Sequence, residues 1–76
     1  MYFRYQTAFG TFWIKPDSDR EGRYLLGFED IPIGNYATPE EAAQDVYAQN
    51  TGWERWDSLM EISGPEHIGQ WEQVEG

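Results

Sequence analysis

Alternating aromatic and polar positions in the first third of the chain predict short β-strands. Three runs are rich in strand-forming residues, and Gly10 breaks the chain before the second run. In the third run Tyr24, Leu26 and Phe28 fall on one face at a period of two, which is the spacing of a strand with one buried face. The predicted strands are residues 2–7, 11–15 and 23–29.

The polar segment 16–22 between the second and third strands raises the question of a calcium site. From Asp17 the sequence reads D-x-D-x-E-G, which is how a calcium-binding loop begins. The twelfth position of such a loop carries a bidentate glutamate, but here it is Phe28. Arg20 and Arg23 would also repel a cation. We therefore interpret the segment as a hairpin loop rather than a metal site.

The strongest local pattern predicts a helix in the middle of the chain. Thr38 is a suitable N-cap, Pro39 suits the first helical position, and Glu41 stands where a capping box needs its acid. The helix should run from Pro39 to Gln49 or Asn50. Its apolar stripe comprises Ala42, Ala43, Val46 and Tyr47, and the two alanines allow close approach to a sheet.

The pattern after this helix is weaker and rich in tryptophan. Residues 53–63 are best read as a helical start that does not persist, with a short strand at Leu59–Ile62 as the alternative. A final turn over Pro65–Glu72 sets Ile68 and Trp71 three residues apart, so that both can close over a core. The fold class predicted is α+β in one domain, residues 1–76. It consists of a three-stranded antiparallel meander, one α-helix and a Trp-rich C-terminal segment.

Composition explains how so short a chain could build a core. The 76 residues contain no cysteine but four Trp, five Tyr and four Phe, and aromatic side chains bury much area per residue. The absence of cysteine excludes disulfides and thiolate metal sites. No apolar run reaches membrane length and the first residues do not form a signal peptide, so we expect a cytoplasmic protein without membrane contact.

The charge of the chain is strongly acidic and unevenly distributed. Fourteen acidic residues against five basic ones give a net charge of −9. Residues 1–23 hold four bases and three acids, whereas residues 24–76 hold eleven acids and Arg55 as the only base. Direct binding of nucleic acid is disfavoured, because no basic patch is available to neutralise phosphates. The charge favours a protein partner with a basic surface, with solubility alone as the alternative.

Several short motifs occur along residues 23–74, at Gly34, Tyr36, Thr38, Pro39, Glu40, Ala42, Ala43, Asp45, Val46, Thr51, Gly52, Trp56, Asp57, Pro65, Ile68, Trp71 and Glu72. Together they resemble those of a set of small uncharacterised bacterial and phage proteins. Those proteins share a short β meander, a TPEEAA helix, a TG…WD segment and a terminal P-x-x-I/L-x-x-W-E. The resemblance covers residues 23–74 and implies a bacterial or phage origin and an α+β fold, but it assigns no activity and no functional residue.

Two kinds of surface residue are candidates for partner binding. Strand alternation places Trp13 on the sheet face opposite Phe12 and Ile14, away from the helix. There it either packs against Arg4 or Lys15 by a cation–π contact or docks a partner. A set of carboxylates forms a negative surface if its members converge in the fold. These acidic candidates are Glu29, Asp30, Glu40, Glu41, Asp45, Glu54, Asp57 and Glu61.

The functional hypothesis is a non-catalytic acidic protein-binding module, acting as a monomer or homodimer. The first alternative is a DNA-mimic or anti-defence inhibitor, which by its size and charge would be similar to anti-CRISPR proteins. The second alternative is a small enzyme using His67, the sole histidine, which lies beside Glu66; it is disfavoured because nothing else in the sequence marks a cleft that could hold a substrate. We expect no cofactor and no bound metal.

Overall fold

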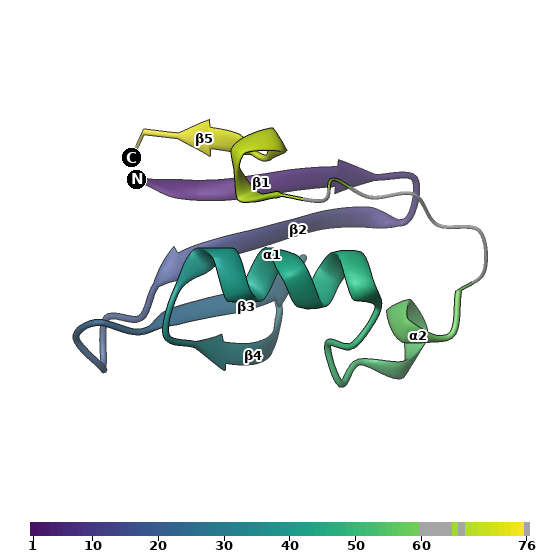
Figure 1. Ribbon diagram of the computed structural model, residues 1–76, viewed down its shortest axis with the longest axis horizontal. Coiled ribbons are helices and arrows are strands. Elements are labelled where there is room, and N and C mark those ends of the chain that lie inside the picture. Colours follow the sequence, from purple (N-terminus) through teal and green to yellow (C-terminus); the bar gives the residue numbers. More distant parts are fainter. Residues whose placement is uncertain (60–64, 66, 76) are drawn as a thin grey trace.

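The computed structural model describes residues 1–59, 65 and 67–75. Its strands are β1 (Tyr2–Thr7), β2 (Gly10–Pro16), β3 (Tyr24–Phe28), β4 (Ile31–Tyr36) and β5 (Glu72–Val74). Its helical segments are α1 (Pro39–Ala48), α2 (Glu54–Asp57) and the 3₁₀ helix η1 (Ile68–Gln70) (Figure 1). The five strands form one sheet in the order β4-β3-β2-β1-β5, and all neighbouring strands are antiparallel.

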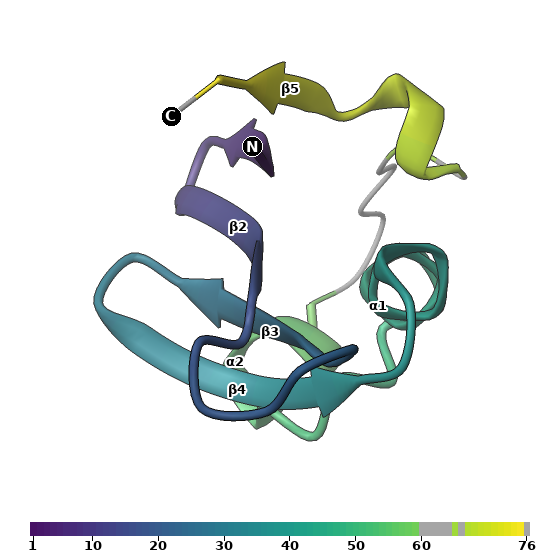
Figure 2. The same ribbon diagram turned by 90° about the vertical axis from the view of Figure 1, so that its left-hand side faces the viewer.

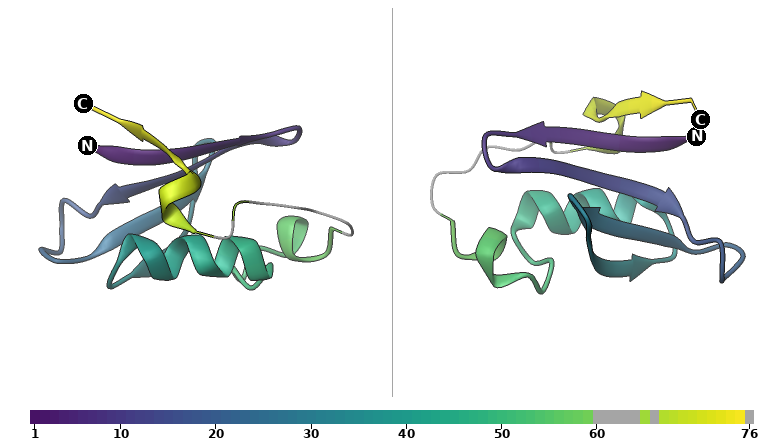
Figure 3. Two further views of the ribbon diagram at one scale, coloured as in Figure 1. Left: turned by 45° about the horizontal axis from the view of Figure 1, so that its top comes forward. Right: turned by 180° about the vertical axis from the view of Figure 1, so that it is seen from behind.

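The sheet curves around the main helix. Viewed along the helix, the strands wrap from β4 to β5 with α1 on the concave side (Figure 2). From behind, the strands lie in front of α1 and the described helices leave this convex face uncovered (Figure 3). One face of the sheet is therefore available for the core and the other for solvent or a partner.

The predicted α+β class is confirmed, but the prediction of three strands is wrong because the sheet has five. β4 contains Pro32 and Gly34, which weaken a strand pattern in the sequence. Pro32 is tolerated because β4 is an edge strand, where one side of the backbone needs no partner. β5 has three residues, too few for a periodic signal, and its pairing of Val74 with Tyr2 joins the two ends of the sequence.

The polar segment between β2 and β3 is a hairpin loop, as predicted. The backbone N–H of Asp17 donates to the carbonyl of Arg23 over 2.9 Å and closes the loop. The Asp17 carboxylate accepts hydrogen bonds from the backbone N–H of Asp19 at 2.9 Å and from the side-chain amide of Asn35 at 2.8 Å. The carboxylate with which a calcium loop would begin is thus used in hydrogen bonds within the loop and to Asn35 in β4.

Helix α1 begins where the sequence predicts and ends slightly earlier. The Thr38 hydroxyl accepts a hydrogen bond from the backbone N–H of Glu41 at 3.2 Å, so Thr38 is the N-cap. The last helical residue is Ala48, because Gln49 adopts the left-handed conformation with φ of 55°. The N–H of Gln49 binds the carbonyl of Val46 at 3.2 Å, which satisfies one of the free carbonyls at the helix end.

The apolar stripe of α1 is narrower than predicted. Ala42, Ala43 and Val46 are buried, but Tyr47 is 43% exposed, and its assignment to the buried stripe is wrong. Tyr47 lies at the margin of the stripe, and the two alanines bring the helix backbone close to the sheet. A bulky ring at that margin remains outside the core.

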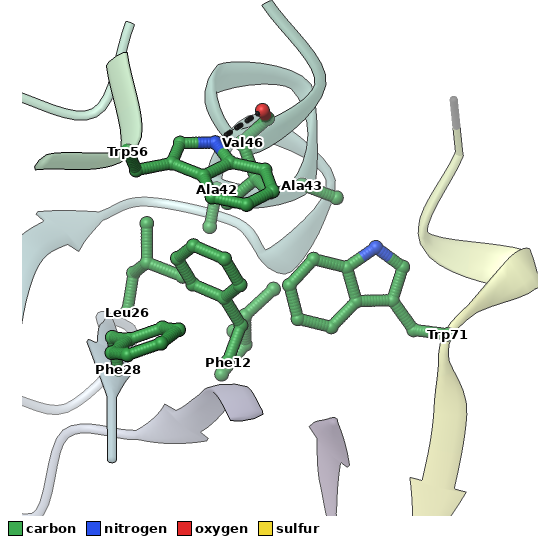
Figure 4. Packing of buried hydrophobic residues seen from close by; sticks show 9 residues of the cluster. Phe12, Leu26, Phe28, Ala42, Ala43, Val46, Trp56 and Trp71 are labelled. Carbon is green, nitrogen blue, oxygen red and sulfur yellow. Dashed lines mark hydrogen bonds between the residues drawn. The ribbon is translucent and has the colours of Figure 1, made fainter. Parts of the chain in front are cut away.

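The core is an aromatic cluster between the sheet and α1. Phe12 lies at its centre and meets Trp56 edge-on, with ring centroids 4.7 Å apart, and Phe28 at 4.9 Å (Figure 4). The indole N–H of Trp56 donates to the carbonyl of Val46 over 2.9 Å, so this large ring is buried with its polar atom satisfied. The buried cluster comprises Phe12, Ile14, Leu26, Phe28, Ala42, Ala43, Val46, Trp56 and Trp71.

The C-terminal segment closes the core as predicted. Ile68, in η1, packs against the cluster, and Trp71 is 4% exposed. The helical start after Gly52 is confirmed by α2, which is held by the side chain of Gln49 through hydrogen bonds to the carbonyls of Trp56 at 2.9 Å and Leu59 at 2.7 Å. The alternative strand at Leu59–Ile62 falls mostly outside the described residues.

Candidate functional site

An open groove of about 410 Å³ lies between the end of β4 and the first turns of α1. The N-cap at Thr38 fixes where α1 starts, so Glu40 and Glu41 fall in its first turn. Asp45 follows on the same side of the helix, one turn later. The groove is lined by Tyr36, Glu40, Glu41, Gln44 and Asp45.

Tyr36 forms the wall of the groove on the side of the sheet. Its hydroxyl donates a hydrogen bond of 2.8 Å to the carboxylate of Asp45. Its ring lies against Gly34, where an added Cβ would come within 2.8 Å of the ring atom Cε1. The absence of a side chain at Gly34 therefore lets the Tyr36 ring lie along the strand and reach α1.

The same environment keeps the Tyr36 hydroxyl protonated. Partial burial raises the pKa of Tyr36 well above its usual value, and the hydrogen bond to Asp45 and the negative charges of Asp45 and Asp57 raise it further. A neutral phenol can continue to donate to Asp45 over the whole physiological pH range. The groove is thus lined by carboxylates and by one aromatic ring, which the hydrogen bond to Asp45 holds in place.

The groove carboxylates are not neutralised by the rest of the described chain. Glu40 and Glu41 are exposed, and no described lysine or arginine lies within ion-pair distance of either residue or of Asp45. The ion pair found among the described residues joins Arg4 and Glu72 at 2.8 Å, on the convex face. The groove can therefore accept a cationic side chain from outside the protein.

Trp13 lies on the convex face of the sheet, as predicted, and it is packed there. Its indole N–H donates to the carbonyl of Glu29 over 2.7 Å, and its ring covers Gly27 on the neighbouring strand. The ammonium of Lys15 lies 4.9 Å from the centre of the indole ring and 5.0 Å from that of Tyr2. The predicted cation–π contact is confirmed with Lys15. The docking role of Trp13 stays a prediction.

Two of the remaining acidic candidates, Glu29 and Asp57, accept hydrogen bonds within the protein. Glu29 adopts the left-handed conformation with φ of 52° in the β3–β4 turn, and its carboxylate accepts from the backbone N–H of Thr11 at 3.3 Å. Asp57 accepts three hydrogen bonds, from the N–H and hydroxyl of Thr51 at 3.0 and 2.8 Å and from the N–H of Gly52 at 2.9 Å. Both carboxylates are occupied within the protein.

The acidic candidates among the described residues do not all gather in one place. Asp30 lies just before β4, and the carboxylates of α1 lie after it. Asp30 and the α1 carboxylates are therefore separated by the length of this six-residue strand, about 20 Å. Glu54 lies in α2, beyond the C-terminal end of α1 (Figure 1). Glu61 is outside the described residues. Only Glu40, Glu41 and Asp45 are brought together in the groove.

Sequence reasoning missed two features that the fold creates. Tyr36 was not a candidate, although a tyrosine two residues before a helix cap stands where a strand end meets the first helical turn. The second feature is an apolar cleft of about 250 Å³ beside α2. Its lining combines residues from the β1–β2 turn, from β3, and from α2 and the residues that flank it, namely Phe9, Phe28, Trp53, Arg55, Trp56 and Leu59.

Three further features considered in the sequence are His67, a metal site and a membrane span. His67 is exposed and precedes η1, where its carbonyl accepts from the N–H of Gln70 at 2.9 Å. Within the described part of the chain, no three histidine or carboxylate side chains are close enough together to hold a metal ion. No helix among the described residues has the length and apolar character needed to cross a membrane.

Comparisons with models of protein families, with curated proteins and with solved structures give no match to this chain.

Proposed function

We propose that the protein is a non-catalytic binding module that takes a basic segment of a partner protein into the groove beside α1. The observation that carries this proposal is the gathering of Glu40, Glu41 and Asp45 around one fixed tyrosine ring, with no described lysine or arginine paired to them. A lysine or arginine side chain can place its charge on the carboxylates and its stem or guanidinium against the ring of Tyr36.

The charge of the whole chain supports the same proposal. A net charge of −9 attracts a basic partner from a distance and speeds the encounter, while the groove supplies the local contact. The acidic groups of a DNA mimic would have to form an extended row, and the described carboxylates are separated or occupied instead. We therefore favour a local contact with a basic peptide segment over imitation of a nucleic acid backbone.

The test compares two double variants with equal net charge. Glu40→Gln with Glu41→Gln removes two exposed charges from the groove, and Asp30→Asn with Glu54→Gln removes two exposed charges elsewhere. Each tagged protein is used to capture partners from a lysate of the source organism at about 0.05 M salt, followed by elution at about 0.5 M, where surface charges are screened within a few Å.

The proposal expects a partner with a basic segment that elutes at high salt, is lost with the groove variant and is retained by the control variant. Equal loss with both variants would show that only overall charge matters and would contradict a groove-specific contact. Capture of the same partner by wild type and groove variant alike would overturn the proposal. A large basic groove on the captured partner that normally holds DNA or RNA would favour the DNA-mimic alternative.

A further inference from the structure

The β1–β2 turn holds an apolar side chain out into solvent. Thr7 fixes this turn, because its hydroxyl donates to the carbonyl of Gly10 at 2.8 Å and accepts from the N–H groups of Phe9 and Gly10 at 3.0 and 3.1 Å. Phe9 at the tip is 59% exposed. The hydrogen-bonded turn thus holds the phenyl ring as a projecting knob. Its backbone is already ordered, so less conformational entropy is lost when a partner binds the ring.

The apolar cleft beside α2 provides a hole of suitable size next to this knob. The rings of Phe28 and Trp53, with centroids 4.6 Å apart, form one wall, and Leu59 and Trp56 also line the cleft. Its volume is about 250 Å³. An apolar cavity of about 150 Å³ is enough to bind benzene, so a phenyl ring fits in this one.

Phe9 lines the rim of the same cleft, so knob and hole belong to one patch. A two-fold interface requires this arrangement, because the same surface must supply both sides of the contact. We propose that two copies of the chain associate about a two-fold axis, each inserting Phe9 into the cleft of the other. The occupant of the cleft is thus a second copy of the protein. This interface is separate from the acidic groove and does not depend on it.

The charges around the cleft fit an approach of two acidic chains. Arg55 is the only charged residue in the lining, and no described carboxylate lies within ion-pair distance of it. The lining therefore adds no repulsion between carboxylates to the contact, and each Arg55 is attracted by the net charge of −9 on the other copy. Salt screens the remaining long-range repulsion while leaving the apolar contact intact. Association should therefore strengthen as salt rises, whereas binding of a basic segment in the acidic groove should weaken.

Sedimentation equilibrium of the purified full chain tests this inference. Wild type should shift from monomer to dimer as protein concentration rises, and further at about 0.5 M than at about 0.05 M salt. Phe9→Ala should weaken dimerisation by about tenfold or more, because a buried aromatic anchor is lost. Arg55→Glu should also weaken it, because the change of −2 takes the net charge of each copy from −9 to −11 and increases the repulsion between copies, and this effect should shrink at high salt.

Ile31→Ala is the matched control. Ile31 is 48% exposed and does not line the cleft, so this variant loses a comparable exposed apolar side chain and should dimerise like wild type. Circular dichroism checks that each variant is folded. A wild type that stays monomeric at both salt concentrations would overturn the inference. Dimerisation of Phe9→Ala equal to that of wild type would also overturn it and would point to pairing through a sheet edge. Neither result affects the test of the acidic groove.

Discussion

The indole ring of Trp13 occupies the space where a side chain on Gly27 would stand. The two residues are opposite each other on β2 and β3, and a Cβ added to Gly27 would collide with the ring atoms Cζ2, Cε2 and Cη2 of Trp13. This contact lets the indole lie flat on the convex face and reach the carbonyl of Glu29. The fold therefore requires a glycine at position 27, within strand β3.

We therefore expect Gly27→Ala to destabilise the protein by about 1–3 kcal/mol, because the ring must move and lose its hydrogen bond. Urea unfolding followed by circular dichroism measures the change. In a Trp13→Val background the same substitution should be neutral or stabilising, since alanine is favoured over glycine in a strand when space is free. An equal loss of stability in both backgrounds would contradict the proposed clash.

The two buried tryptophans of the core provide a matched pair. The indole N–H of Trp56 donates to the carbonyl of Val46, whereas the buried indole N–H of Trp71 has no hydrogen-bond partner among the described residues. Both substitutions to phenylalanine remove the same atoms from an apolar site (Figure 4). Trp56→Phe should therefore be more destabilising than Trp71→Phe by about 1–2 kcal/mol, since only the first breaks a buried hydrogen bond. Equal free energies of unfolding would contradict this account.

The carboxylate of Asp57 holds together the connection between α1 and α2. Its three hydrogen bonds to Thr51 and Gly52 predict that Asp57→Ala lowers the free energy of unfolding by about 2 kcal/mol. Glu54→Ala, at an exposed position of the same short helix, should change it by less than about 0.5 kcal/mol. Thermal unfolding compares the two variants. A similar small effect of both would mean that the Asp57 contacts do not contribute to stability.

The raised pKa of Tyr36 makes stability depend on pH in the alkaline range. The folded protein favours the neutral phenol, whereas the unfolded chain loses this proton from about pH 10 upward. The contribution of Tyr36 is fully present below that pH and is lost as the pH rises above it. Tyr36→Phe should therefore lose stability less steeply than wild type between about pH 9 and pH 11. Parallel curves for wild type and Tyr36→Phe, measured by urea unfolding, would show that Tyr36 is not the group responsible.

The elements with strong local signals could be predicted from the sequence. The start of α1 was predictable because capping at Thr38 is a contact within one turn of the chain. The loop between β2 and β3 was predictable because its polar residues form their hydrogen bonds largely with one another. The pairing of Lys15 with Trp13 was predictable because both residues project from the same face of one strand.

The edge strands and the candidate sites could not be predicted in this way. β5 has three residues, and it is a strand only because β1, at the other end of the sequence, offers it an unpaired edge. The acidic groove forms because Tyr36, at the end of β4, donates a hydrogen bond to Asp45 in α1. The apolar cleft forms because Phe9 and Trp53, which are separated in the sequence by three strands and a helix, line the same space. Contacts between residues so far apart in the sequence produce no local sequence pattern.

The sequence alone thus determined the α+β class, the main helix, the aromatic core and the acidic charge, because these follow from periodicity, capping and composition. Tertiary structure decided how many strands join the sheet and which carboxylates remain available. Of the acidic candidates, Asp57 is occupied by Thr51 and Gly52, whereas Glu40 and Glu41 stay exposed in the groove. The physical reason is that a carboxylate's role depends on whether the folded chain brings donors to it, as the turn at Thr51 and Gly52 does for Asp57 and as no described lysine or arginine does for Glu40 and Glu41.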